Sequence, residues 1–163
     1  MAQKREAQFE RILDARRERV WQVWTDPKLV AKWWGPNDVT IPECEIDLRV
    51  GGRIYIVMLA GEAMGPYKGT RWPMEGQFTK IEPLSRLTYT ARAWTEGQGA
   101  ETQIDQITDI TFEDQKGKTK VTINVTITNA DTAPKAALEG MSYGFNQQLD
   151  KLAKFLTPNT SRS

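Results

Sequence analysis

The sequence predicts an α+β fold in which a curved antiparallel sheet of about seven strands is covered by one long C-terminal helix. Apolar residues follow a helical period between residues 14 and 34, which indicates two short helices. From 39 to 129 the period falls to two, as in strands, and from 138 to 156 it returns to three or four. A sheet with one apolar face needs a cover, so we expect the last helix to lie across it.

The two short helices follow a first strand expected over residues 8–13. Asp14 stands where the N-cap of the first helix would be, and Asp26-Pro27 offers a second cap with proline at the first helical position. Gly35-Pro36 ends the second helix.

The central part of the chain predicts six further strands joined by turns. Gly51-Gly52 separates the first two of them, which indicates a hairpin. The strands are expected over residues 39–48, 53–58, 72–81, 86–94, 103–113 and 118–129. The chain has no internal repeat and no linker composition. We therefore expect a single domain over residues 7–156, with flexible tails at 1–6 and 157–163.

Composition excludes several function classes. The 163 residues carry 22 Lys and Arg against 21 Asp and Glu, so a net charge of +1 provides no field that would gather nucleic acid or an anionic membrane. No apolar run approaches the ~20 residues that span a bilayer, so no stable membrane insertion is expected. No nucleic-acid partner is expected either.

The lack of histidine limits the possible chemistry. A Ser-His-Asp triad, a Cys-His pair and a histidine-based zinc site are impossible without it. Cys44 is the single cysteine, so it can form no internal disulfide, which favours a reducing, cytoplasmic setting. No sequence motif indicates a metal ion, a nucleotide or another cofactor, and we expect none.

Strand parity separates the inward-facing residues into two groups. One group, here called the bulky end, consists of Phe78, Leu87, Phe112 and Val121. The other, here called the mixed end, consists of Met58, Trp72, Met74, Ala93, Gln106 and Thr108. Small residues, flexible methionines, an indole and two uncharged hydrogen-bonding side chains are typical of a small-molecule pocket.

The last helix starts where the final strand ends, so its first half should lie over the mixed end. Trp33 and Trp34, which lead into the strand that begins at Val39, should lie near it too. The predicted ligand-binding residues are therefore Trp34, Met58, Trp72, Met74, Gln106, Thr108, Leu138, Met141 and Phe145.

Two glycines in the last helix require a reason, because each costs about 1 kcal/mol relative to alanine. Gly140 and Gly144 lie one turn apart. They could leave room for a ligand or a gate beside Met141. Alternatively, they could allow close packing of helix on sheet, or a kink.

Other candidate groups favour structural roles. Glu43, Glu45 and Asp47 alternate along one strand and could be paired acid–base carboxylates, although a solvent-facing row explains the same spacing. Arg49 and Arg53 could hold an anionic group, or could pair with Asp47.

Two further features carry no recognisable chemistry. Cys44 has no histidine or second cysteine to activate it, so a structural role is expected. Gly51-Gly52 is not a phosphate-binding loop, because no GK[ST] or GxGxxG follows and the next element is a strand.

Several segments resemble the bacterial relatives of the activator of heat-shock protein 90 ATPase, in the START-like, or Bet v-like, helix-grip superfamily. These segments are Val20–Pro27, Lys32–Pro36, Asp47–Arg53, and Gly76 with Ile81–Pro83 and Leu87. The resemblance covers about residues 8–156 in order and implies a curved antiparallel sheet that grips a C-terminal helix around an apolar cavity. The superfamily includes carriers of lipids and hydrophobic metabolites, polyketide cyclases, antibiotic self-resistance proteins and co-chaperone domains.

The expected function is therefore the binding of a small hydrophobic or aromatic molecule, with no catalytic residue assigned. One alternative is a cyclase-like or hydrolytic enzyme that uses the cavity, which a buried Glu or Asp facing it would favour. A second is a co-chaperone-like interaction module, which an exposed apolar patch would favour. The expected assembly is a monomer or homodimer.

Overall fold

The computed structural model describes residues 5–97, 103–129 and 135–156, with only the backbone described at 5, 129 and 135–143. Its elements in chain order are β1 (Arg5–Leu13), α1 (Arg17–Thr25), α2 (Pro27–Trp33), β2 (Val39–Ile46), β3 (Arg53–Ala60), the 3-10 helix η1 (Glu62–Tyr67), β4 (Arg71–Glu82), β5 (Arg86–Ala93), β6 (Ile104–Gln115), β7 (Lys118–Asn129) and α3 (Lys135–Leu156).

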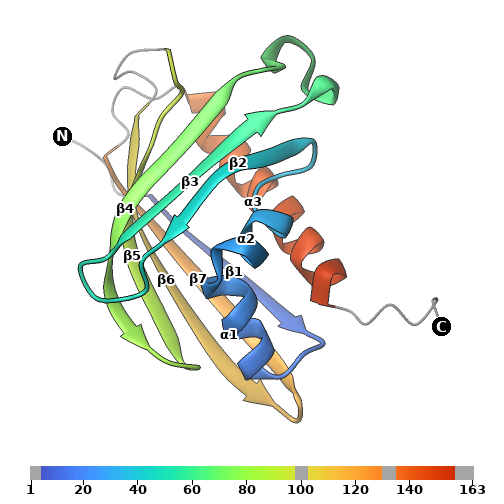
Figure 1. Cartoon of the computed structure of the whole chain (residues 1–163), viewed down its shortest axis with the longest axis vertical. Coiled ribbons are helices and arrows are strands. Elements are labelled where there is room, and N and C mark those ends of the chain that lie inside the picture. The colour runs from blue at the N-terminus through green and yellow to red at the C-terminus, as the bar shows by residue number, and fades with distance from the viewer. Residues whose placement is uncertain (1–4, 98–102, 130–134, 157–163) are drawn as a thin grey trace.

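The strands form one antiparallel sheet in the order β1-β7-β6-β5-β4-β3-β2. Figure 1 shows the curved sheet with α3 running along its inner side and α1 and α2 between the two edge strands. The predicted helix-grip architecture is confirmed. The pairing of the first strand with the last, for example Arg11 opposite Val121, had no signal in the sequence.

The two short helices begin differently. Asp26 caps α2 as predicted, because its Oδ1 accepts a hydrogen bond of 3.0 Å from the backbone N–H of Lys28. The prediction that Asp14 caps α1 is wrong. Arg16 is the N-cap residue and provides no side-chain hydrogen bond. The preceding turn is held by β7 instead, since the Thr119 hydroxyl donates to the Ala15 carbonyl at 2.7 Å.

Strands β4 and β5 approach each other closely at Gly76, which replaces an inner-face side chain. A Cβ atom on Gly76 would lie 1.6 Å from the carbonyl oxygen of Thr90, so β4 and β5 approach more closely there than any other residue permits. The connection between β3 and β4 contains η1, a short 3-10 helix.

The core lies between the inner face of the sheet and the three α-helices. Leu149, Leu152 and Leu156 of α3 are buried, as the apolar spacing of this segment predicted. Under α1 and α2, the Trp24 and Trp33 rings meet edge-on with centroids 4.9 Å apart. This cluster adjoins the bulky end through Phe112, which contacts Trp24.

Candidate functional site

The strand pairing brings the predicted mixed-end residues together on the inner face. Met58 lies opposite Trp72 across β3 and β4. Met74 lies opposite Ala93 across β4 and β5, and Ala93 in turn lies opposite Ile104 of β6. The side-chain period of two, applied to correctly placed strands, was sufficient to predict this grouping.

The two ends of the inner face differ in exposure. At the bulky end every side chain is buried, as at Phe78, Leu87, Phe112 and Val121. At the mixed end Met74 and Thr108 are buried, but the other four side chains remain partly exposed. These are Met58, Trp72, Ala93 and Gln106, and the neighbouring Ile104 of β6 is partly exposed as well.

A chain of three uncharged polar side chains crosses the boundary between the two ends. Gln106 Nε2 donates a hydrogen bond of 3.3 Å to the hydroxyl of Thr108. Thr108 is 1% exposed and hydrogen-bonds to the phenol of Tyr89, which is 2% exposed and lies opposite it on β5. Burial raises the pKa of Tyr89 to about 12, and the hydrogen bond with Thr108 opposes that shift. The phenol therefore stays neutral at physiological pH.

The other predicted residues are not all at the mixed end, since Phe145 packs on Phe9, which lies in one cross-strand row with Leu87 of the bulky end. Trp34 is 8% exposed and packs on Trp33 with ring centroids 5.6 Å apart. The ring of Trp72 lies 6.4 Å from that of exposed Tyr67 in η1. Phe145 stacks on Phe9 of β1 at 4.7 Å. The side chains of Leu138 and Met141 lie outside the described residues.

The loop after α2 contacts Met58. A Cβ on Gly35, where φ is +86°, would lie 2.9 Å from the sulfur of Met58, so only glycine fits between the loop and β3. This places the loop that contains Trp34 beside the mixed end, as expected.

Three side chains of α3 fasten that loop. Gln148 Oε1 accepts a buried hydrogen bond of 2.8 Å from the N–H of Gly35, and Gln147 Oε1 accepts an exposed one of 3.0 Å from the N–H of Asn37. Lys151 Nζ donates to the carbonyl oxygens of Trp34, Gly35 and Pro36 at 3.2, 3.2 and 3.3 Å. Burial lowers the pKa of Lys151, with the charge of Asp38 acting the other way. The sequence did not predict these bonds between α3 and the loop, because no local pattern indicates a hydrogen bond between segments more than a hundred residues apart.

Gly144 lies against the same loop. A Cβ at this position would be 3.7 Å from Pro36, an ordinary van der Waals contact. The neighbour of Gly144 is therefore a loop and not the sheet, and there is room for a methyl group. Gly140 lies in the part of α3 of which only the backbone is described, so what surrounds it is outside the described residues.

The row of carboxylates on β2 faces solvent. Glu43 pairs with Arg71 at 2.6 Å, and Asp47 pairs with Arg49 at 2.8 Å. Arg53 bridges Glu45 and Glu75 at 3.0 and 2.6 Å instead of pairing with Asp47. The arginines and acids on this outer face thus neutralise one another. The strand expected over residues 39–48 is shorter, since β2 ends at Ile46, and Leu48 beyond it is 39% exposed.

Cys44 has the environment of a structural thiol. Burial, followed by the charges of Asp26 and Glu45, raises its pKa to about 11, so the thiolate is not populated at neutral pH. Among the described residues, no three histidine, cysteine or acidic side chains are grouped so that they could hold a metal ion.

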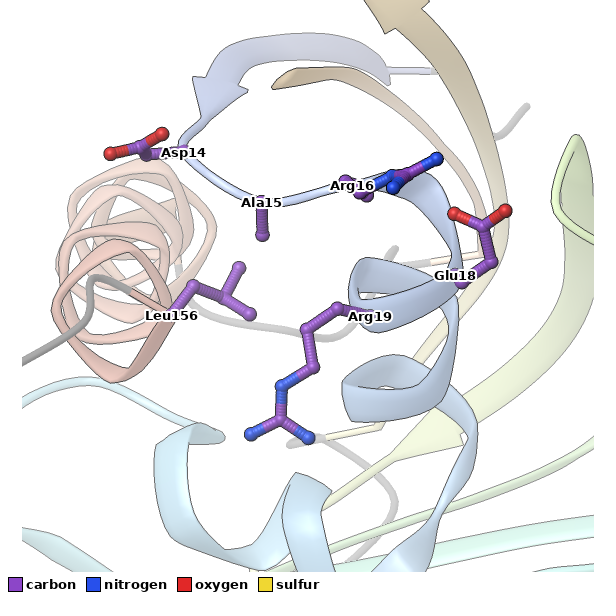
Figure 2. Close-up of a pocket in the computed structure, with 6 residues that line it drawn as sticks. All are labelled: Asp14, Ala15, Arg16, Glu18, Arg19 and Leu156. Atoms are coloured by element: carbon purple, nitrogen blue, oxygen red, sulfur yellow. The ribbon is translucent and has the colours of Figure 1, made fainter. Parts of the chain in front are cut away.

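A surface hollow of about 560 Å³ lies elsewhere, between the turn before α1 and the last turn of α3. Figure 2 shows Ala15 and Leu156 facing this space, with the carboxylates of Asp14 and Glu18 turned away from it. Two acids and two arginines share its lining, so the hollow has no dominant charge. Arg19 is already engaged, since it donates to Gln22 Oε1 at 3.1 Å.

No helix within the described ranges is long and apolar enough to cross a bilayer.

Comparison with known proteins identifies the family. A family model described as "Activator of Hsp90 ATPase homolog 1-like protein" matches residues 14–157. Protein CV1439 from Chromobacterium violaceum has a similar crystal structure, with 28% identity, a TM-score of 0.79, and coverage of 94% of this chain and 98% of that one. No curated protein matches the chain.

Two further solved structures show the same fold. A protein from Arthrobacter aurescens, solved by NMR, is 23% identical with a TM-score of 0.77, over 95% of this chain and 87% of that one. Protein NE0264 from Nitrosomonas europaea is 23% identical with a TM-score of 0.72, over 93% of each chain. Fold and family together indicate a ligand-binding or interaction module. With the family model matching most of its length, this chain belongs to the family of proteins like activator of Hsp90 ATPase homolog 1.

Proposed function

We propose that this protein binds a small hydrophobic or aromatic molecule between the mixed end of the sheet and the first half of α3. The observation that carries the proposal is the difference in exposure along the inner face. Side chains at the bulky end are all buried, whereas Met58 and Trp72 of the mixed end, and Ile104 beside it, are apolar, face inward and remain partly exposed.

Such a surface favours an apolar ligand for energetic reasons. Each Å² of apolar surface removed from water contributes roughly 25 cal/mol, so a ligand that covers these side chains gains affinity by burial. Methionine adapts to ligand shape through its three rotatable bonds, and the Trp72 indole offers a flat surface for a ring. Gln106 supplies a polar group that can orient the molecule.

The two alternatives have less support from the described residues. The buried polar residues among them are Thr108, Thr119 and Gln148, so none of the described residues is the buried Glu or Asp that would favour acid–base chemistry in a cavity. The large apolar side chains that are well exposed are distributed over β1, the β2–β3 turn, η1 and β6. They do not form one docking patch of the kind that an interaction module presents.

Titration with N-phenyl-1-naphthylamine tests the proposal, because this neutral aromatic probe brightens in apolar surroundings. We expect saturable binding of one probe per chain. Ala93→Phe should fill the mixed end and weaken probe binding by at least about tenfold, equivalent to 1.4 kcal/mol. Thr90→Phe is the matched control, since Thr90 lies on the same strand and is exposed on the outer face.

The control should bind the probe like the unmodified protein, and both variants should keep a cooperative unfolding transition. Linear, unsaturable fluorescence would contradict the proposal. So would equal affinity in the Ala93→Phe variant.

A further inference from the structure

We infer that the ligand carries an uncharged hydrogen-bonding group, such as an amide, which Gln106 recognises, and that the site disfavours a carboxylate of the same shape. The inference rests on the proposed function and specifies its ligand class. Its starting point is the chain of polar side chains that runs from Tyr89 through Thr108 to Gln106.

The hydrogen bond to Thr108 uses one N–H of the Gln106 amide and leaves its carbonyl oxygen and its second N–H available. One N–H is used by the 3.3 Å bond to the Thr108 hydroxyl. In the part of the chain that the structure describes, the carbonyl oxygen and the second N–H of this amide make no other hydrogen bond. A primary amide with a free acceptor and a free donor matches a ligand group that donates and accepts through neighbouring atoms.

Thr108 and Tyr89 act as positioning residues. Both are almost completely buried, so they hold the Gln106 amide from below without reaching the exposed surface themselves. Gln106, by contrast, is partly exposed and lies where the buried part of the inner face ends. Of the three linked side chains, Gln106 is therefore the one whose polar group would contact a bound molecule.

The described surroundings of Gln106 carry no charge. Its strand neighbour Ala91 and the inner-face residues Met74, Ala93 and Ile104 are apolar. Arg11 is a cation on the inner side of β1, but it lies opposite Val121 at the bulky end and is paired with Asp150 at 2.8 Å. A carboxylate buried beside Gln106 would lose its hydration and meet no counter-charge from the side chains that the structure describes, whereas an amide would be satisfied.

Displacement of N-phenyl-1-naphthylamine at pH 7.5 by two ligands of equal shape tests the inference. 2-Naphthamide should displace the probe at a concentration at least about tenfold lower than 2-naphthoate does. Gln106→Leu should reduce this preference, because the leucine side chain can neither donate to nor accept from the amide of the ligand. Gln77→Leu makes the same substitution on the exposed outer face of β4 and should keep the preference.

The positioning role of Thr108 has its own readout. Thr108→Val should reduce the preference for the amide, and Thr108→Ser, which restores the hydroxyl, should recover it. A change in general packing would instead alter probe affinity in both variants.

The possible failures are distinguishable. If the probe does not saturate, the proposed function fails and this inference falls with it. If the probe saturates but Gln106→Leu keeps the amide preference, only this inference is overturned. Equal or stronger displacement by 2-naphthoate also overturns it. That result would point to a cation near the site, such as Arg5. This residue lies opposite Ile127 in the sheet, and its side chain is outside the described residues.

Discussion

Removing the amide of Gln148 should destabilise the protein measurably, because that amide satisfies a buried backbone donor. Gln148 is 6% exposed, and its Oε1 accepts from the N–H of Gly35 at 2.8 Å. Gln148→Met keeps the length of the side chain but removes the acceptor. The stranded N–H should then cost about 1–3 kcal/mol. For a domain of this size, that corresponds to a fall in Tm of roughly 2–12 °C.

Gln147 provides a matched control. Its Oε1 also accepts from a loop N–H, that of Asn37 at 3.0 Å, but this bond is exposed and water can replace it. Gln147→Met should therefore change stability by no more than about 0.5 kcal/mol. Urea unfolding followed by tryptophan fluorescence measures both variants. Equal effects at the two positions, or a loss below about 0.5 kcal/mol for Gln148→Met, would refute the argument that burial decides the value of this contact.

Three further outcomes are expected. Gly144→Ala should stabilise α3 by up to about 1 kcal/mol in urea unfolding, since the methyl group meets Pro36 at an ordinary distance; destabilisation would show that the loop cannot accept it. Gly76→Ala should instead lower Tm by more than the Gln148 variant does, because the added Cβ overlaps the backbone of β5. Hydrogen bonds from Arg86 hold the pKa of Asp109 below its usual value. The stability from that pair is present above about pH 4 and is lost as pH falls through the lowered pKa. Asp109→Asn should therefore reduce stability at pH 7 and make less difference near pH 2, measured as urea midpoints across that range; a pH-independent difference would contradict this.

Much of the fold could be predicted because it depends on local patterns. Period-two alternation located β7 at residues 118–129 and assigned Val121 and Ile123 to the buried face. Apolar spacing found α3, and Asp26-Pro27 correctly marked the start of α2. These signals act within a few residues, so one sequence contains them completely.

The features that could not be predicted depend on contacts between distant segments. The N-cap of α1 was predicted at Asp14 but is Arg16. The turn between these residues is held by a hydrogen bond from Thr119 of β7, a contact that the local sequence does not contain. The bonds of Lys151 to three loop carbonyls are invisible in the sequence, since a lysine on an amphipathic helix ordinarily faces water.

The candidate site shows the same division. Parity placed Met74, Gln106 and Thr108 on one face, and the register agrees. The link from Thr108 to Tyr89 was not foreseen, because a hydrogen bond between two strands depends on their register and not only on which face a side chain occupies.

The pairing of β1 with β7 sets the order in which the chain can fold as it is made. Arg5 lies opposite Ile127, so β1 is synthesised more than a hundred residues before its partner strand. At about 5–20 residues per second, β1 waits on the order of 5–20 s before it can be incorporated. Nascent chains that stop before β7 should therefore carry β1 as an unpaired segment open to chaperones, and a chain arrested there should be more sensitive to protease near residue 9 than the finished protein.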